Sequence, residues 1–297
     1  MTTEQMEINQ EVNQEINQEI NQENSKEPNQ NYFQAIGIIK GNVSLATETR
    51  EPSNISIQGK NYPLFYIPKK QGFKAFEAFQ KEVESTGNTD QRLIVYPKII
   101  HFPAREKPHI VGFQLVGFVR DGVTEGVTAD LADFEFKLSG LWQFIPVCQT
   151  PCISVFKNFN YDRLEYVKKA ELYQRVRFMK GSHIPLLWKD APVKPFRFNP
   201  RLEKDEQGKP YFASIKAKFL PGRNVFGFES LLMLPQDEAP KFFKASKKMK
   251  AEALQATKEF KKAQKFQKPI EAEQRTQAVV VAEKPKKPLP KPKSKKV

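Results

Sequence analysis

The sequence predicts a mainly β protein with minor α content, built around two consecutive small β-barrels. The first observation is a pair of β-type runs with glycines inside them, Tyr32–Gly41 and His109–Val119. Glycine within a strand marks a bulge, a sharp bend at a barrel corner or a close approach of two backbones. Two such strands around a short β-rich segment predict a curled, barrel-like sheet over residues 31–121.

The second observation is a hairpin pattern inside that segment. Asn54–Ile57 and Tyr62–Ile67 flank the turn-forming residues Gln58–Asn61. Runs rich in β-branched and aromatic residues on both sides of a glycine turn predict two paired strands.

The third observation is one helix between strands. In Gly72–Val83 the apolar residues recur at helical spacing, and Gly87 is placed to end the helix. The runs Arg92–Tyr96 and Ile99–Phe102 then read as strands, separated or bent at Pro97. If the first run bends into two strands, the count fits a five-stranded OB-like barrel.

A second OB-like β-barrel is predicted over residues 134–236. Its first run contains Phe136-x-x-x-Gly140, which echoes Phe33-x-x-x-Gly37 in the first unit. Phe212–Leu220 and Val225–Phe228 then flank a Pro-Gly turn. The two units are therefore candidates for a diverged tandem duplication, and the short echo leaves that question open.

The chain divides into six predicted parts. They are an acidic low-complexity head (1–30), the first barrel-like domain (31–121), a linker (122–133), the second barrel-like domain (134–236), a basic amphipathic helix (237–268) and a Lys/Pro tail (269–297). The head repeats a Glu-Ile/Val-Asn-Gln unit, which predicts disorder or, alternatively, a small self-associating helix. The tail is predicted to be disordered, because its prolines lack donors and its charges repel.

Charge is distributed unevenly along the chain. The formal net charge is +14. The head is strongly acidic, the body is mildly basic and the C-terminal part is strongly basic. This pattern favours a polyanionic partner, with solubility as the alternative reading.

Composition also indicates the cellular compartment. The chain has only two Cys, so no disulfide framework is expected, and a reducing compartment is the default. No apolar run approaches the length of a membrane helix. We therefore expect a soluble cytoplasmic protein with no membrane partner.

Nucleic-acid binding is the best-supported function, because basic and aromatic residues interleave along several runs. Arg175 and Arg177 would share one strand face and contact phosphates, and Trp188 is the aromatic residue most readily placed at the surface. The candidate binding residues are Arg92, Tyr96, Lys98, Arg105, Lys157, Tyr161, Arg163, Arg175, Arg177, Lys180, Trp188, Lys189 and Arg197.

Signatures of catalysis are absent from the sequence, so no catalytic residue, cofactor or metal ligand is assigned. The pair Cys148 and Cys152 has no second Cys pair and no His at ligand spacing, so reduced thiols across a tight turn are expected, with a disulfide between them as the alternative. The three His have no obvious nucleophile beside them. Asp130, Asp133 and Glu135 read as a solvated acidic linker.

The predicted function is therefore non-catalytic binding of single-stranded DNA or RNA, by stacking and phosphate contacts on the barrel faces. One alternative is a protein-interaction or scaffold module in which the helix of residues 241–267 docks a protein partner. Another is a nucleic-acid enzyme with an unrecognised site.

Overall fold

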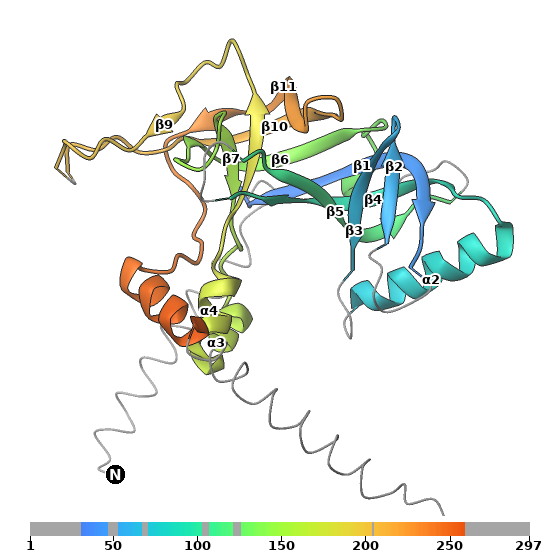
Figure 1. The fold of residues 1–297 in the computed structure, drawn as a ribbon. Coiled ribbons are helices and arrows are strands. Elements are labelled where there is room, and N and C mark those ends of the chain that lie inside the picture. Colours follow the sequence, from blue (N-terminus) through green and yellow to red (C-terminus); the bar gives the residue numbers. More distant parts are fainter. Residues whose placement is uncertain are drawn as a thin grey trace, which may run out of the picture. The chain divides into compact units, whose positions relative to one another are not determined.

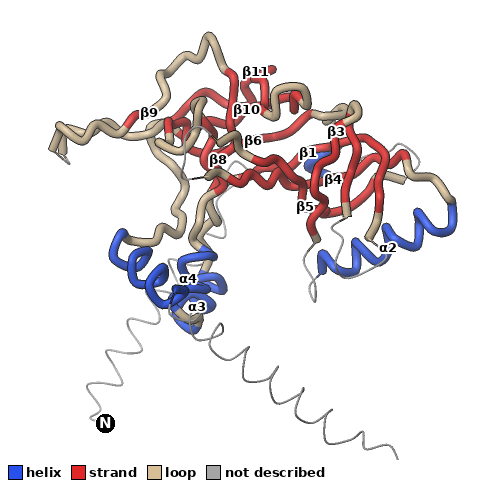
Figure 2. Tube along the Cα trace, viewed as in Figure 1, coloured by secondary structure: helices blue, strands red, loops and turns tan. Residues whose placement is uncertain are grey.

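The computed structural model describes residues 31–46, 53–66, 71–102, 107–120, 126–203 and 205–258. The acidic head, the Lys/Pro tail and the candidate Arg105 lie outside these residues. The described residues form two compact units, one within residues 31–160 and 181–243 and the other within residues 161–180 and 244–258. Strands dominate the described part of the chain, and helices are few (Figure 2), so the predicted mainly β class is confirmed.

Five strands of the first unit close into a β-barrel (Figure 1). They are β1 (Gln34–Ser44), β2 (Asn54–Ile57), β3 (Lys60–Phe65), β4 (Asp90–Ile100) and β5 (Ile110–Phe118). The pairing runs β1-β2-β3-β5-β4 and returns to β1, and only the β3–β5 contact is parallel. Helix α2 (Gln71–Thr86) connects β3 to β4 and buries Phe76 and Phe79.

The local turns follow from residues that accept a left-handed backbone. Gln58 and Gly59 have φ of 50° and 78°, so β2 and β3 are joined by a tight two-residue turn. The predicted hairpin is confirmed, with a turn shorter than the four residues expected. Gly87 has φ of 65°, and its N–H donates to the Val83 carbonyl at 2.9 Å, which ends α2 as predicted.

Strand β4 runs without a break through Pro97, so the predicted separation into two strands at this residue is wrong. Pairing of β4 with β1 ends at Val95, while pairing with β5 continues to Ile100. Beyond Val95, β4 therefore has a partner on one side only. Proline, which lacks an N–H donor, is tolerated in a strand at such an edge.

A second set of five strands closes in the same pairing order. The strands are β6 (Glu135–Phe144), β7 (Cys152–Val155), β8 (Ser182–Leu187), β10 (Phe212–Leu220) and β11 (Val225–Gln236). Their pairing runs β6-β7-β8-β11-β10 and returns to β6, with the β8–β11 contact parallel. We call this set the second ring. The 3-10 turn η1 (Gly126–Thr128) precedes β6, and the short strand β9 (Phe196–Arg197) pairs with β6.

Equivalent glycines let the first strand of each set change partners. A β-carbon on Gly41 would lie 2.3 Å from the Ser56 carbonyl oxygen on β2. A β-carbon on Gly140 would lie 2.5 Å from the Ser154 carbonyl oxygen on β7. The structural counterpart of Gly140 is therefore Gly41. The sequence comparison had matched Gly140 with Gly37, four residues earlier.

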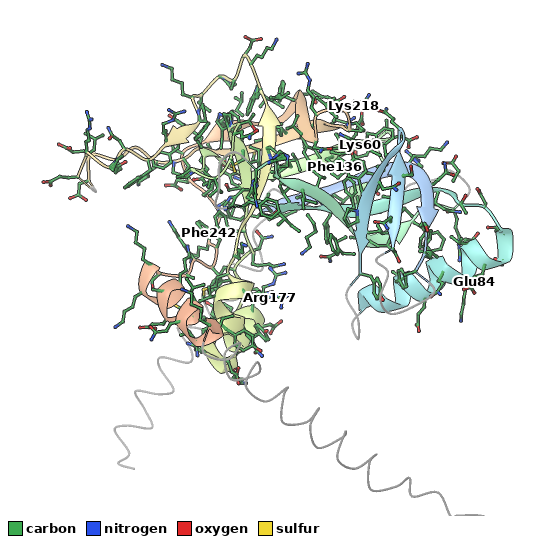
Figure 3. The ribbon with its side chains drawn as sticks, viewed as in Figure 1. Lys60, Glu84, Phe136, Arg177, Lys218 and Phe242 are labelled. Atoms are coloured by element: carbon green, nitrogen blue, oxygen red, sulfur yellow. The ribbon has the colours of Figure 1, made fainter. Side chains whose placement is uncertain are left out.

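The barrel and the second ring share one hydrophobic core. Strand β1 pairs with β6 over Gln34–Gly37 and Phe136–Ser139. At this junction the fully buried Phe136 ring (Figure 3) lies against Gly37, where an added β-carbon would approach its Cδ1 atom to 2.2 Å. The ring also packs against Phe113 of β5 and Phe226 of β11, at centroid distances of 6.3 and 5.0 Å.

The other compact unit contains short helices. They are α3 (Tyr161–Lys169), α4 (Leu172–Phe178) and a helix over residues 247–258. The buried residues of this unit include Val167, Ala170 and Ala253, and the Tyr166 and Phe178 rings lie 5.2 Å apart.

Two sequence predictions are wrong in this unit. Arg175 and Arg177 lie on helix α4, where residues two apart point in different directions, so they do not share a strand face. The basic helix begins at residue 247, so residues 237–246, which were predicted as its first part, precede it.

The glycine crossings generate a stability prediction. Gly41→Ala and Gly140→Ala should each lower the free energy of unfolding by about 1–3 kcal/mol, because the new methyl group meets a backbone carbonyl. Gly222→Ala is the matched control, since no atom lies within 4 Å of its added β-carbon. Urea unfolding should separate the variants, and equal stability of all three would contradict the assigned crossings.

Candidate functional site

Strand β4 presents alternate residues to solvent on the outside of the barrel. Leu93, Val95 and Pro97 are buried, whereas Tyr96 and Lys98 are exposed. This alternation is the period of two that a half-buried strand imposes. The sequence predicted Tyr96 and Lys98 as site residues, and the structure places both on this outer face.

Strand register brings a second aromatic residue onto the same face. Tyr96 lies opposite Gln114 of β5, and Gln114 lies opposite Phe65 of β3. The Phe65 ring rests on Gly112, where an added β-carbon would lie 2.7 Å from it. Gly112 is in turn the register partner of Lys98. The side chains of Phe65 and Tyr96 are 36% and 42% exposed.

We define the outer strip as Phe65, Tyr96, Lys98, Ile100 and Ile110. Ile100 and Ile110 form a cross-strand pair at the end of β4 and β5, and both are exposed. The strip therefore combines two accessible ring faces, a cation and an apolar end. This combination can bind flat, negatively charged ligands, because rings stack and the ammonium group attracts anions.

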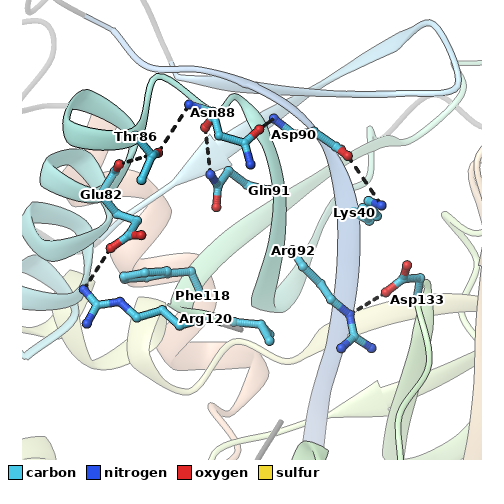
Figure 4. A pocket seen from close by; sticks show the side chains of 11 residues that line it. Lys40, Glu82, Thr86, Asn88, Asp90, Gln91, Arg92, Phe118, Arg120 and Asp133 are labelled. Atoms are coloured by element: carbon cyan, nitrogen blue, oxygen red, sulfur yellow. Dashed lines mark hydrogen bonds and ion pairs between the residues drawn. The ribbon is translucent and has the colours of Figure 1, made fainter. Parts of the chain in front are cut away.

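A polar pocket of about 620 Å³ lies on the same barrel, beside the end of α2 (Figure 4). Its walls carry three cations, and each one pairs with a carboxylate. The pairs are Lys40–Asp90 at 3.4 Å, Arg92–Asp133 at 2.5 Å and Arg120–Glu82 at 3.1 Å. Arg120 also lies over the Phe118 ring at 5.0 Å.

Arg92, a predicted binding residue, is held in this pocket by structural contacts. Its Nε donates to Asp133 at 2.5 Å, and its Nη2 donates to the Leu131 carbonyl at 3.1 Å. These contacts hold the segment that precedes β6. The Arg92 guanidinium therefore already has a carboxylate partner within the protein and is a weaker candidate for contacting a phosphate.

The acidic cluster before β6 is also paired with cations. A hydrogen bond from Lys137 to Asp130, at 2.6 Å, is the main cause that lowers the pKa of Asp130. Burial raises the pKa of Glu135, but hydrogen bonds from Lys216 and from the Ala132 N–H outweigh burial and hold this pKa below its usual value. Asp130 and Glu135 are therefore paired with sheet lysines, while the Asp130 side chain remains exposed to solvent, as predicted.

Positive charge is concentrated in the helical unit. Residues 161–180 and 244–258 contain eleven Lys and Arg against four Asp and Glu, a difference of seven. Tyr161, Tyr166 and Tyr173 stand among these charges with 46–48% of their surface exposed. The unit thus offers cations and ring faces together.

The predicted residues of this unit have different environments. Arg177 (Figure 3) and Lys180 are exposed. Arg163 is half-buried, and Arg175 is half-buried and donates from Nε to the Ala170 carbonyl at 3.0 Å. Arg177 and Lys180 are therefore the more accessible pair.

Trp188 is buried, so its predicted place at the surface is wrong. Only 9% of it is exposed, and its ring stacks on Phe228 at 4.6 Å and packs against Trp142 at 5.4 Å. The prediction relied on the prolines near Trp188. These prolines belong to the loop that follows, and they do not indicate whether the Trp188 ring is buried.

The remaining candidates lie apart from the outer strip. Lys157 and Lys189 are exposed on connections of the second ring. Arg197 is exposed on β9 and lies over the Phe144 ring at 4.4 Å. The structure does not bring these three residues together with Tyr96 and Lys98.

Sequence reasoning missed Phe65, Ile100 and Ile110. The signal for the isoleucines was present, because they continue the alternation of Tyr96 and Lys98 on a strand taken to be interrupted at Pro97. Phe65 depended on the parallel β3–β5 contact, which local sequence does not reveal.

Comparison of the chain with models of known protein families, with curated proteins and with solved structures gives no match. Within the described ranges, no helix is both long and apolar enough to cross a bilayer. The same residues contain no group of three or more His, Cys, Asp or Glu arranged to hold a metal ion. The site is therefore interpreted from its own geometry.

The pocket generates a prediction about Arg92. Arg92→Gln and Asp133→Asn should each destabilise the protein by about 1 kcal/mol, and the double variant should be less destabilised than the sum, since the two side chains are one partly exposed pair. A double-mutant cycle from urea unfolding measures this coupling. Strict additivity would show that the pair contributes nothing to stability.

Proposed function

We propose that this protein binds single-stranded DNA or RNA without catalysing a reaction on it. The observation that carries the proposal is the outer strip, where Phe65 and Tyr96 flank Gln114 on neighbouring strands with Lys98 beside them. Stacking on exposed rings suits unpaired bases, whose flat faces a duplex hides. An adjacent ammonium group suits the phosphate backbone.

Strand order adds support at the level of fold. A five-stranded barrel with a parallel contact between its third and fifth strands, and a helix between the third and fourth, has the arrangement of an OB-like barrel. The second ring repeats the strand order, but α3 and α4 come between its second and third strands. We therefore infer two tandem OB-like domains.

The helical unit supplies the electrostatic part of the mechanism. Its excess of seven cations attracts a polyanion irrespective of sequence, and its exposed tyrosines add stacking surfaces. In this mechanism the helices attract the nucleic acid, and the outer strip binds its unpaired bases.

Truncating the rings of the strip tests the stacking step. Phe65→Ala and Tyr96→Ala should each weaken binding of a labelled oligothymidine or oligouridine about 5- to 150-fold, the loss of about 1–3 kcal/mol per stacked base. Fluorescence anisotropy with the full chain measures the change.

Phe198→Ala is the matched control, because Phe198 is 59% exposed but lies on the loop after β9. Unchanged affinity in both strip variants, with unaltered unfolding curves, would remove the strip from the mechanism.

Reversing charge on the helical unit tests the collecting step. Arg177→Glu with Lys180→Glu should lower affinity for all sequences alike and reduce the slope of log K against log salt by about 1–2. Lys189→Glu with Lys194→Glu is the control, since both residues are exposed outside the helical unit. Equal slopes in the two double variants would mean that charge anywhere on the protein suffices.

A protein-interaction or scaffold role is the second candidate, and one observation favours it. Leu254 on the helix of residues 247–258 is 58% exposed. An exposed leucine on a basic helix suits docking into an apolar groove of a partner. Leu254→Gln, which removes the apolar side chain without changing charge, should leave nucleic-acid affinity unchanged under the first proposal and should abolish capture of a protein partner under the second.

A further inference from the structure

All three His and both Cys of the chain gather at one place in the first compact unit. His101 follows β4 and His109 precedes β5, and their rings lie 5.5 Å apart. His183 on β8 lies 6.3 Å from the His101 ring. Cys148 lies in the β6–β7 connection, and Cys152 begins β7. Both thiols are free and buried.

Hydrogen bonds fix one proton on His101. Its Nε2 lies 2.7 Å from the His183 carbonyl oxygen, which only accepts, so Nε2 carries hydrogen. The Cys148 sulfur lies 3.6 Å from Nδ1 and 3.7 Å from Nε2 of the same ring. With Nε2 donating to the carbonyl, Nδ1 is the atom that shares a proton with the Cys148 sulfur.

The second shared proton lies between the two thiols. A hydrogen bond from Cys152 is the main cause that lowers the pKa of Cys148 to about 5, and hydrogen bonding to His101 adds to it against the effect of burial. The same contact, together with burial, raises the pKa of Cys152. Both effects favour Cys148 as the thiolate and Cys152 as the thiol of the pair.

Neighbouring groups keep this arrangement in place. Cys152 also donates to the Gln143 carbonyl at 3.4 Å, and Ser154 bonds His183 Nδ1 at 2.8 Å. His109 Nε2 donates to the Asn224 carbonyl at 2.6 Å. Each imidazole thus has a partner that orients it toward the cluster.

We propose that Cys148 and Cys152 form a peroxide-reactive dithiol site, with Cys148 as the attacking thiolate and Cys152 as the resolving thiol. A thiolate beside an imidazole and a second thiol is the arrangement in which cysteine oxidation is selective. The proposal depends only on these contacts and does not rest on nucleic-acid binding.

The chemistry balances with hydrogen peroxide as the oxidant. The Cys148 sulfur attacks one peroxide oxygen, the O–O bond breaks, and hydroxide leaves and takes a proton to become water. Cys148 is then a sulfenic acid. The Cys152 sulfur attacks the Cys148 sulfur, the S–OH bond breaks, and the thiol proton leaves with the hydroxyl group as a second water. Two electrons pass from the two sulfurs to peroxide, and a disulfide remains.

Access requires a local opening of the β6–β7 connection, because only 1% of Cys148 is exposed. The turn before it is held by the Cys148 N–H, which donates to the Ile145 carbonyl at 2.9 Å. Pro146 and Gln149 on either side of Cys148 are exposed. Opening one turn of a surface connection is a low-energy fluctuation compared with global unfolding.

The test oxidises the reduced full-length protein at pH 7 with a small excess of hydrogen peroxide and then counts thiols after denaturation. We expect both thiols to be lost, and the tryptic peptide that contains both Cys to lose two hydrogen masses. Dithiothreitol should restore both. Cys152→Ser should stop at a sulfenic acid on Cys148 that dimedone traps, whereas Cys148→Ser should leave Cys152 unmodified.

A second measurement needs no variant. Iodoacetamide should alkylate Cys148 in the native protein at a rate that stays high as pH falls from 8 and declines only near pH 5. His101→Gln should move this decline to higher pH, and Phe198→Ala, on the exposed loop after β9, should leave it in place.

Three outcomes would overturn the proposal. One is a native protein that retains both thiols under peroxide, and another is alkylation that rises only above pH 8. The third is stoichiometric zinc in the purified protein that blocks oxidation until it is chelated, since the cluster would then be a metal site.

Discussion

The contact between Phe136 and Gly37 is the constraint on which the rest of the first unit depends. Strands β1 and β6 approach so closely that a single methyl group on Gly37 would overlap the Phe136 ring. The ring lies between Phe113 of the barrel and Phe226 of the second ring. Because one side chain belongs to both sets of strands, the two sets form a continuous core. The interiors of the two sets are therefore connected at this contact.

The long strands could be anticipated from sequence, but their partners could not. Alternation and glycine punctuation identified the runs that became β1, β4, β5 and β10, as well as the helix α2, because these signals are local. The parallel contacts of β3 with β5 and of β8 with β11 join residues far apart in the chain, so no local pattern records them. The continuity of β4 through Pro97 depended on where its pairing with β1 stops, which is also a non-local property.

The candidate site was likewise predictable only where it depends on local sequence patterns. Tyr96 and Lys98 were found because a strand repeats every two residues, whereas Phe65 reached their face through the β3–β5 contact. Arg92 and Trp188 failed as surface contacts for a different reason. A sequence shows charge and ring type, but it does not show that Asp133 neutralises the arginine or that Phe228 covers the indole. Composition thus indicated a basic protein, and the structure shows that many sheet cations are paired while the helical unit carries the excess.

The tryptophans give this arrangement a spectroscopic consequence. The chain has only two Trp, and Trp142 and Trp188 lie together in the second ring, where Trp142 Nε1 donates to the Val193 carbonyl at 3.2 Å. Intrinsic emission therefore reports on that half of the core and leaves the barrel with tyrosine signals alone. A change in tryptophan emission on occupancy of the outer strip would report a change that passes from the barrel strands into the shared core. Tryptophan fluorescence can thus report how strongly the barrel and the second ring are coupled.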